Sequence, residues 1–597
     1  MVMPPTSTFA MTFGAELIPN GGVRFRLYAP SATSVELALD GAAPEPLHRD
    51  DDGFFLRVDS RARAGSRYAF VVDGLRVPDP ASRFNPEGPH GPSVVIDPGA
   101  FLWPQDDWRG RPWHEHVFYE IHVGTFTPEG TYAAAAAKLP LLVELGITAI
   151  ELMPLAQAPG KRNWGYDGVL PYAPAHTYGT PDDLKALVAR AHALGIALYL
   201  DVVYNHFGPE GNYLHAYARE FYSDRHDTPW GAAIDVLGNA HVRAFFIQNA
   251  LYWLEEFRFD GLRLDAVHAI HDGEDRAFLR ELAATVHTCA SRPVHLVLEN
   301  DDNESALLEA GFRAQWNDDA HHAAHVAVTA ERDGYYADYA EATTALLGRT
   351  LTKGFGYQGE PSGMRGGKLR GDPSDHLAHT SFVNFLQNHD QIGNRPFGER
   401  ITALAPDYAV RAVVAALLLA PPVPLLFMGE EWGASTPFLF FCDFEPDLAR
   451  AVTAGRRGEF GTFAAFADVA THERIPDPNA PETFARSTLR WDERATSPHD
   501  AWLAYYRNLL RIRALEIAPR SALACGIDAD YAGIGECGLR ARWRLDDGCM
   551  LGLETNLGET AQAGFSANPK GYIVFSTHDP TFTNGIAPPW SVRWTID

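Results

Sequence analysis

The sequence is poor in cysteine. Its five cysteines are odd in number and lack the C-x-x-C spacing typical of metal ligands. Widely separated cysteines of this kind are typical of reduced thiols, so the sequence predicts a cytoplasmic protein without a cysteine-based metal site. The five are Cys289, Cys442, Cys525, Cys537 and Cys549.

Positive charge is also scarce. Lysine and arginine number 50 against 76 aspartate and glutamate, which gives a formal net charge of -26. Nucleic acids and anionic membranes bind proteins through an excess of lysine and arginine, so the sequence predicts neither as a partner. A neutral or cationic small molecule is the more natural partner.

Long apolar runs are missing as well. No stretch approaches the roughly 20 apolar residues of a membrane span, and residues 1–17 lack the basic and apolar regions of a signal peptide. We therefore expect neither secretion nor membrane insertion. Hydrophobic residues make up 46% and charged residues 21% of the 597 residues, as in an ordinary globular protein with several domains.

Both ends of the chain carry short alternating runs typical of β-structure. In residues 1–100, runs such as VRFRLYAP (23–30) stand between Gly, Pro and Asp residues and predict an immunoglobulin-like β-sandwich. Similar runs, such as LRARWRL and YIVFS, return in residues 519–597. They predict a C-terminal antiparallel β-domain.

Residues 101–518 repeat a module of helix, glycine and β-rich run, with the glycine at Gly146, Gly195 and Gly261. Each glycine is expected to adopt the left-handed conformation that ends a helix. Five further β-rich runs bring the count to eight. Eight runs separated by helices favour a central (β/α)8 TIM barrel, closed by a helix at 499–517, with a doubly wound sheet as the alternative.

Four of the predicted strands end in polar clusters. Reactive groups of a TIM barrel lie where its strands finish, so polar residues there carry more weight than elsewhere. A lone strand-end carboxylate is as often structural as functional, but three on different strands favour an active site. The clusters are Asp201, Asn205 and His206; Arg263, Asp265 and His268; Glu299; and Asn388, His389 and Asp390.

The run FDGLRLDAVHAI (259–270) places a cation and an anion among leucines. Side chains alternate along a strand, so Arg263 and Asp265 share one face while the leucines face outward to the helices. A structural ion pair is the simplest interpretation. The neighbouring clusters favour a second one, in which the arginine keeps the aspartate ionised inside an active site.

Two carboxylates that face an acetal are the minimum for glycoside hydrolysis. Asp265, beside Arg263, suits the ionised partner that attacks or stabilises the sugar cation. Glu299, at the end of an apolar run, is the better candidate for a protonated carboxyl that helps the leaving oxygen depart. Asp390 is left to hydrogen-bond the ring hydroxyls.

Sugar sites also need exposed aromatic faces. Most of the aromatic residues in this chain belong to the core. Better candidates lie in glycine-containing loops that follow strand ends, where a packed ring is less expected. They are Trp164, Tyr166, Trp230, Tyr335 and Tyr336.

The segments DVVYNH, DGLRLDAVH, LVLEND and QNHDQIGN resemble, in this order, the four strand-end motifs of the α-amylase family of glycoside hydrolases. The resemblance spans about residues 111–515. It implies a retaining mechanism on α-glucosidic bonds, with Asp265 as nucleophile, Glu299 as general acid/base and Asp390 as transition-state stabiliser. It also implies that Tyr166, His206, Arg263 and His389 contact the reacting glucose.

The sequences around these motifs, such as FYEIHVGTFTPEGTY and NWGYDGVLPYAP, are similar to those of one branch of that family. Members of the branch hydrolyse the α-1,4 bond next to the terminal trehalose of a maltooligosyl-trehalose. A glucan branching or debranching enzyme is the alternative. Because the carboxylates are present, an inactive accessory subunit is disfavoured. By this resemblance the substrate-binding set also includes Trp230, His268, Asp333, Tyr335, Tyr336, Gln391 and Asn394.

A metal is not expected. Many α-amylases bind calcium through the asparagine that matches Asn205 and a large insertion after the third strand, whereas here the insertion, about 207–237, is short. We therefore expect no cofactor, an oligosaccharide as partner, and a monomer or weak homo-oligomer. The acidic residues of the insertion are Glu210, Glu220, Asp224, Asp227 and Asp235.

Overall fold

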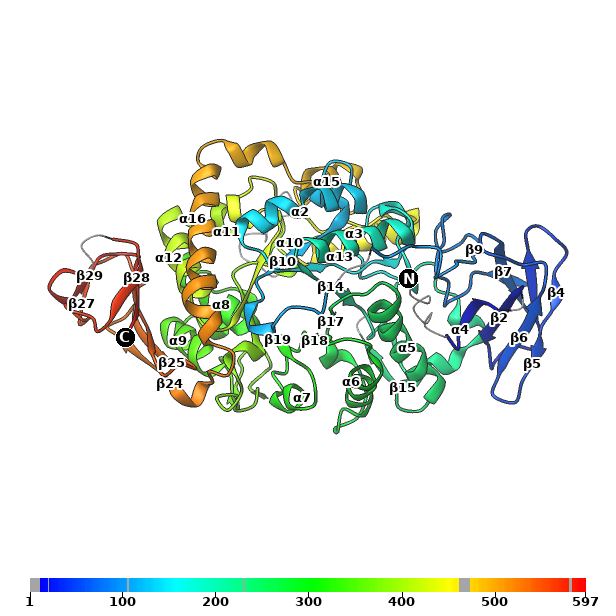
Figure 1. Ribbon diagram of the computed structural model, residues 1–597, viewed down its shortest axis with the longest axis horizontal. Coiled ribbons are helices and arrows are strands. Elements are labelled where there is room, and N and C mark those ends of the chain that lie inside the picture. Colours follow the sequence, from blue (N-terminus) through cyan, green and yellow to red (C-terminus); the bar gives the residue numbers. More distant parts are fainter. Residues whose placement is uncertain (1–10, 20, 105–106, 229–230, 461–472, 579–581) are drawn as a thin grey trace.

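A computed structural model describes residues 11–19, 21–104, 107–228, 231–460, 473–578 and 582–597. An N-terminal β-sandwich, a central barrel and a C-terminal β-sheet domain lie in a row along the long axis of the molecule (Figure 1). No helix in these ranges is both long and apolar enough to cross a membrane.

The N-terminal domain is the predicted β-sandwich. Alternation along β2 (Val23–Tyr28) buries Val23, Phe25 and Leu27 and leaves the arginines between them partly exposed. One sheet has the order β1 (Gly14–Leu17), β2, β6 (Phe54–Asp59), β5 (His48–Arg49). The other has the order β4 (Glu45–Pro46), β3 (Val35–Leu39), β7 (Arg67–Val72), β8 (Leu75–Val77), with β9 (Ser93–Val94) paired to β7.

The central domain is a closed barrel of eight parallel strands, which rules out the doubly wound alternative. All eight β-rich runs predicted from the sequence form its strands. The barrel closes where the last strand pairs with the first. In order, the strands are β10 (Phe118–Ile121), β11 (Ala149–Leu152), β14 (Ala197–Val202), β17 (Gly261–Leu264), β18 (His295–Leu298), β19 (Ala314–Trp316), β22 (Phe382–Phe385) and β23 (Val423–Phe427).

Helices surround the barrel, and the predicted closing helix is present as α16 (His499–Ile512) (Figure 1). The longer helices are α2 (Tyr132–Leu145), α3 (Pro181–Ala193), α5 (Ala240–Glu256), α6 (Ala277–Cys289), α8 (Asp318–Thr329), α9 (Thr343–Lys353), α12 (Asp407–Leu418) and α13 (Pro446–Glu459). Shorter ones are α1 (Val123–Phe126), α4 (Leu214–Tyr217), α7 (Ser305–Glu309), α10 (His389–Gly393), α11 (Ile401–Leu404) and α15 (Pro481–Ser487). Hairpins are formed by β12 (Ala156–Gln157) with β13 (Leu170–Pro174), β15 (Tyr222–Thr228) with β16 (Gly231–Ile234), and β20 (Glu360–Pro361) with β21 (Leu369–Arg370).

The barrel strands separate two apolar layers. Leu262 and Leu264 belong to the large core that includes the surrounding helices, as the alternation along β17 predicts. The barrel interior holds a separate cluster that includes Tyr199 and Trp316. The guanidinium of Arg263 lies 4.2 Å from the centre of the Trp316 ring, so the arginine points into the barrel.

The predicted left-handed glycine is found at Gly146 (φ 108°) and Gly195 (φ 76°), but the prediction is wrong for Gly261. Gly261 is the first residue of β17, and Arg258 (φ 57°) takes the left-handed conformation in that turn. A Cβ on Gly261 would lie 2.2 Å from the backbone of β18 and 2.3 Å from the Tyr199 ring. Close packing in the barrel therefore requires this glycine.

The C-terminal domain is the predicted antiparallel sheet, and its indoles anchor it to the barrel helices. Trp543 donates to the Leu351 carbonyl of α9 at 3.0 Å, and Trp594 donates to the Ala415 carbonyl of α12 at 3.1 Å. The strand order is β24 (Ala529–Ile534), β25 (Gly538–Arg544), β26 (Met550–Asn556), β30 (Ser591–Ile596), β28 (Tyr572–Ser576), beside the short pair β27 (Gln562–Ala563) and β29 (Ile586–Ala587).

Gly261→Ala should destabilise the protein by about 1–3 kcal/mol or more, because the added methyl meets backbone and a packed ring that cannot move aside. Urea unfolding measures this loss. Gly455→Ala in α13 is the matched control, since its methyl would meet no atom within 4 Å. It should be neutral or stabilise by up to about 1 kcal/mol. Equal stability of the two variants would contradict the packing role of Gly261.

Candidate active site

Arg263 connects three carboxylates at the carboxyl ends of the barrel strands. Its Nη1 donates to Asp201 Oδ2 at 2.7 Å and to Asp265 Oδ1 at 2.9 Å. Its Nη2 donates to Glu299 Oε2 at 2.7 Å. The arginine side chain has no exposed surface, and a buried cation needs such partners. One guanidinium therefore fixes the positions of all three acids.

Asp265 follows the last residue of β17, where the chain leaves the barrel through Ala266 in the left-handed conformation (φ 41°). Arg263 binds one carboxylate oxygen, as predicted. Asn205 Nδ2 donates to the other, Oδ2, at 2.8 Å. Both oxygens thus accept a hydrogen bond, which stabilises the ionised carboxylate that a nucleophile requires.

Glu299 follows β18, the neighbouring strand. Its Oε2 accepts from Arg263 and from the Ala266 N–H at 2.9 Å. The exposed fraction of the side chain is 19%, compared with 12% for Asp265 and 35% for Asp390. The three predicted catalytic carboxylates therefore open to solvent at the mouth of the barrel, whereas Arg263 stays beneath them.

Asp390 lies in the first turn of α10, next to a charged histidine. Asn394 Nδ2 donates to Asp390 Oδ1 at 3.1 Å, and His389 Nε2 lies 3.4 Å from the same oxygen. His389 Nδ1 is 2.5 Å from Glu120 Oε1 in β10. Burial alone would lower the pKa of His389, but Asp390 and Glu120 raise it to about 10. The imidazole is therefore cationic at neutral pH.

Tyr166 and His206 complete the inner part of the site. The Tyr166 ring stacks on His389, with ring centres 5.1 Å apart and an angle of 24° between the planes. Its hydroxyl donates to Asp201 Oδ2 at 2.7 Å. Burial lowers the pKa of His206 to about 4, so this imidazole is neutral, and its Nε2 lies 3.0 Å from the Tyr166 carbonyl oxygen. Trp164, by contrast, is buried and packs edge-on against His389.

The remaining predicted contacts lie on loops around the mouth. His268 Nδ1 accepts from the Asp301 N–H at 3.2 Å, and Gln391 Nε2 donates to Asp318 Oδ1 at 3.2 Å. These hydrogen bonds connect the loops that follow β17, β18, β19 and β22. The predicted residue Trp230 lies outside the described residues.

The predicted pair Tyr335 and Tyr336 divides into an exposed and a buried ring. Both lie in the short 3-10 helix Gly334–Tyr339, directly after the exposed Asp333. Tyr335 is 42% exposed, whereas Tyr336 is buried and stacks on His325 at 4.2 Å between ring centres. Only Tyr335 of this pair offers an open ring to a sugar, because Tyr336 is used in packing.

Three acidic residues of the site were not predicted as site residues. Glu120 lies in an otherwise apolar strand, and this lone carboxylate was the signal in the sequence that could have identified it as a site residue. Glu151 of β11 is buried and, among the described residues, neither oxygen has a hydrogen-bond partner. Burial and the nearby Asp201 raise its pKa well above the usual range, which favours the protonated form. Asp318 follows β19 in FRAQWNDD, so its place at a strand end was visible in the sequence.

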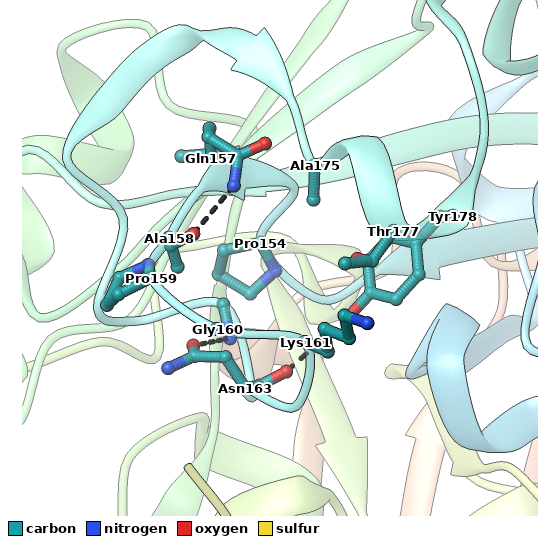
Figure 2. A pocket seen from close by; sticks show the side chains of 12 residues that line it. Pro154, Gln157, Ala158, Pro159, Gly160, Lys161, Asn163, Ala175, Thr177 and Tyr178 are labelled. Carbon is teal, nitrogen blue, oxygen red and sulfur yellow. Dashed lines mark hydrogen bonds between the residues drawn. The ribbon is translucent and has the colours of Figure 1, made fainter. Parts of the chain in front are cut away.

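A small cavity lies in the loop that follows β11 (Figure 2). Its lining includes Gln157, Lys161, Asn163 and Tyr178, and none of the three predicted catalytic carboxylates. The Gly165 N–H donates to Asn163 Oδ1 at 2.6 Å, one residue before Tyr166. The cavity therefore belongs to the loop that supports Tyr166 and is separate from the carboxylates.

Within the described residues, no three His, Cys, Asp or Glu side chains are grouped so that they could hold a metal ion. Asn205, the position that the family resemblance associates with calcium, donates its amide to Asp265. Its oxygen contacts His206 Nδ1. Both ends of this amide are thus bound within the site.

The eight-stranded barrel, together with the matches of this chain to known proteins, shows a glycoside hydrolase of the α-amylase class. Residues 105–231 match the alpha amylase catalytic domain. Residues 12–98 match carbohydrate-binding module 48, the isoamylase N-terminal domain, and residues 528–594 match a domain of unknown function.

The chain belongs to the malto-oligosyltrehalose trehalohydrolase family. It is 45% identical over 525 residues to the malto-oligosyltrehalose trehalohydrolase of Deinococcus radiodurans, which covers 87% of this chain and 86% of the relative. The Saccharolobus solfataricus enzyme of the same name is 40% identical over 513 residues, or 84% and 87% of the two chains. A crystal structure of a Salmonella typhimurium protein, provisionally described as an alpha amylase, has a TM-score of 0.92 at 43% identity and covers 98% of this chain and 100% of that one.

Glu120→Gln should make stability less dependent on pH. The pKa of His389 is raised from 6.5 to about 10, so the stability it contributes is present below about pH 6.5 and is lost as the pH rises toward 10. Without the Glu120 charge the pKa falls, and the variant should lose on the order of 1–3 kcal/mol at pH 7. The decline in unfolding free energy between pH 7 and 10 should become shallower.

Urea unfolding at a series of pH values measures this difference. Glu144→Gln removes an exposed carboxylate from α2 and should follow the wild-type profile. A Glu120→Gln profile parallel to that of the wild type would show that Glu120 does not hold the proton on His389.

Proposed function

We propose that this chain hydrolyses the α-1,4-glucosidic bond next to the terminal trehalose of a maltooligosyl-trehalose, and releases trehalose and a shorter maltooligosaccharide. The observation that carries the reaction class is the binding of Asp265 and Glu299 to the two terminal nitrogens of one arginine. The relatives named above, which match most of the chain, support the choice of substrate.

The binding of both carboxyls to one guanidinium supports a retaining mechanism. Retaining glycosidases hold the nucleophile and the acid/base roughly 5 Å apart, whereas inverting enzymes leave room for a water molecule between them. Because Asp265 and Glu299 bind adjacent nitrogens of the Arg263 guanidinium, they are held close together. Asp265 then attacks the anomeric carbon directly, and the glycosyl-enzyme bond forms as the glucosidic bond breaks.

Glu299 acts on the leaving oxygen. Arg263 and the Ala266 N–H both bind Oε2, which leaves Oε1 to carry the proton that passes to the departing trehalose. In the second half-reaction the Glu299 carboxylate takes a proton from water, and that water attacks the anomeric carbon and frees Asp265. Asp390 and the cationic His389 hydrogen-bond the ring hydroxyls as the sugar flattens toward the transition state.

A glucan branching or debranching enzyme is the alternative function. The 1,4-alpha-glucan branching enzyme of Bacillus caldolyticus is 34% identical to this chain over 288 residues, which is 43% of each chain. The trehalohydrolases match about twice that share of the chain, which favours water as the acceptor. We also propose a cytoplasmic location, which the five free cysteines support.

Substrate selectivity tests this proposal. The enzyme should release free trehalose from maltotriosyl-trehalose at a rate well above its cleavage of maltopentaose. Product analysis by chromatography, with amylose as a third substrate, gives the comparison. Equal rates on the first two substrates would contradict the trehalose assignment, and new α-1,6 branches in amylose would favour the branching enzyme.

Asp265→Asn and Glu299→Gln should each nearly abolish turnover of maltotriosyl-trehalose. The expected loss of rate is on the order of 10⁴-fold for the nucleophile and 10²–10⁴-fold for the acid. The two roles separate on an aryl maltoside whose leaving group needs no proton. There Glu299→Gln should still release the aryl alcohol in a burst, whereas Asp265→Asn should not.

Circular dichroism should show unchanged folds, and Asp447→Asn, at an almost fully exposed carboxylate of α13, serves as the control. Near-normal turnover in either active-site variant would contradict its assigned role.

A further inference from the structure

Asp318 is a fourth carboxyl at the barrel mouth, and the mechanism above does not use it. It is the first residue of α8, two residues after β19, and its side chain is partly exposed. Arg263 does not bind it; Gln391 Nε2 donates to its Oδ1 at 3.2 Å. Asp318 is therefore free to meet a ligand next to Glu299 without disturbing the arginine that positions the three catalytic carboxylates.

The charged groups around Asp318 come from three other segments. Glu299 and Asp301 follow β18, Asp390 lies in α10, and Arg370 ends β21. Removal from bulk water, together with repulsion from Glu299, Asp301 and Asp390, outweighs the attraction of Arg370 and raises the pKa of Asp318 well above its usual range. The raised pKa favours the neutral carboxyl, which offers one O–H donor and one carbonyl acceptor.

The position of Asp318 relative to Glu299 indicates which part of the substrate it meets. Tyr166 and His389, which enclose the reacting glucose, lie on the Asp201 side of Arg263. Asp318 instead follows β19, which lies between β18, the strand before Glu299, and β22, the strand before Asp390. Glu299 protonates the bridging oxygen, so the first ring of the departing sugar must lie against it. A polar group beside Glu299 at the open mouth thus faces the leaving group.

We infer that Asp318 is a specificity-determining residue that hydrogen-bonds hydroxyl groups of the departing trehalose beside Glu299. The inference rests on the proposed trehalohydrolase function and identifies one of the groups that selects its substrate. Trehalose joins its two rings through both anomeric carbons, so its second ring presents its hydroxyls at positions different from those of an α-1,4-linked ring. A leaving group that does not reach Asp318 lacks this hydrogen bond, which disfavours that leaving group.

The experiment compares the ratio of kcat/KM for maltotriosyl-trehalose to that for maltopentaose in the wild type and in three variants. Asp318→Ala removes both hydrogen-bonding atoms, so the ratio should fall about tenfold or more, and inhibition by free trehalose should weaken to a similar degree. Asp318→Asn keeps a donor and an acceptor in the same volume and should restore the ratio to within about threefold of wild type.

Glu309→Gln is the matched control, because Glu309 is an exposed carboxylate in α7 after the neighbouring strand. Its ratio should equal that of the wild type. Thermal unfolding should establish that the variants are folded. If Asp318→Ala does not fold, Asp318→Leu replaces it, and the same fall in the kcat/KM ratio is expected.

Two outcomes would overturn the inference: an unchanged ratio in Asp318→Ala, or a loss in Asp318→Asn as large as that in Asp318→Ala, which would mean that the charge of Asp318 matters instead. If the wild type itself does not prefer maltotriosyl-trehalose, the proposed function is refuted. That outcome can be told apart from the other two because it is seen in the wild type, before any variant is compared.

Discussion

The active site depends on one buried guanidinium. Arg263 has no exposed surface and can be tolerated inside the barrel only because carboxylates surround it. Trp316 covers one face of the guanidinium, at 4.2 Å from the ring centre. The nitrogens are bound by Asp201, Asp265 and Glu299. Removing the arginine would leave three acids in mutual repulsion, so the spacing of nucleophile and acid/base follows from a requirement of electrostatic balance.

The same balance sets the protonation of the surrounding acids. One arginine and one histidine cation cannot neutralise every carboxylate that the strands bring together. Asp265 accepts hydrogen bonds from two donors, and Glu120 is paired with His389. Burial raises the pKa of Glu151 and of Asp318 well above the usual range, which favours their protonated forms. A partly exposed neutral carboxyl can then donate a hydrogen bond to a neutral sugar, which a carboxylate cannot do.

The outer domains pack against helices and loops of the barrel domain. Phe13 of the sandwich meets Phe245 of α5 with ring centres 5.3 Å apart, and the Ser31 hydroxyl donates to Glu220 in the insertion after β14. The sandwich thus packs against α5 and against the insertion that follows β14. On the opposite end of the molecule, the C-terminal sheet holds α9 and α12 through two indole hydrogen bonds (Figure 1).

The sequence by itself determined the eight strands, the sandwich, the C-terminal sheet and the alternation that turns Arg263 inward and Leu262 outward. These features follow from local periodicity, which the sequence displays directly. Tertiary structure alone decided that Gly261 is required by a neighbouring strand and not by a helix end, and that Tyr336 is buried while Tyr335 is open. It also decided the pairing of Glu120 with His389, because residues 269 positions apart meet only when the barrel closes.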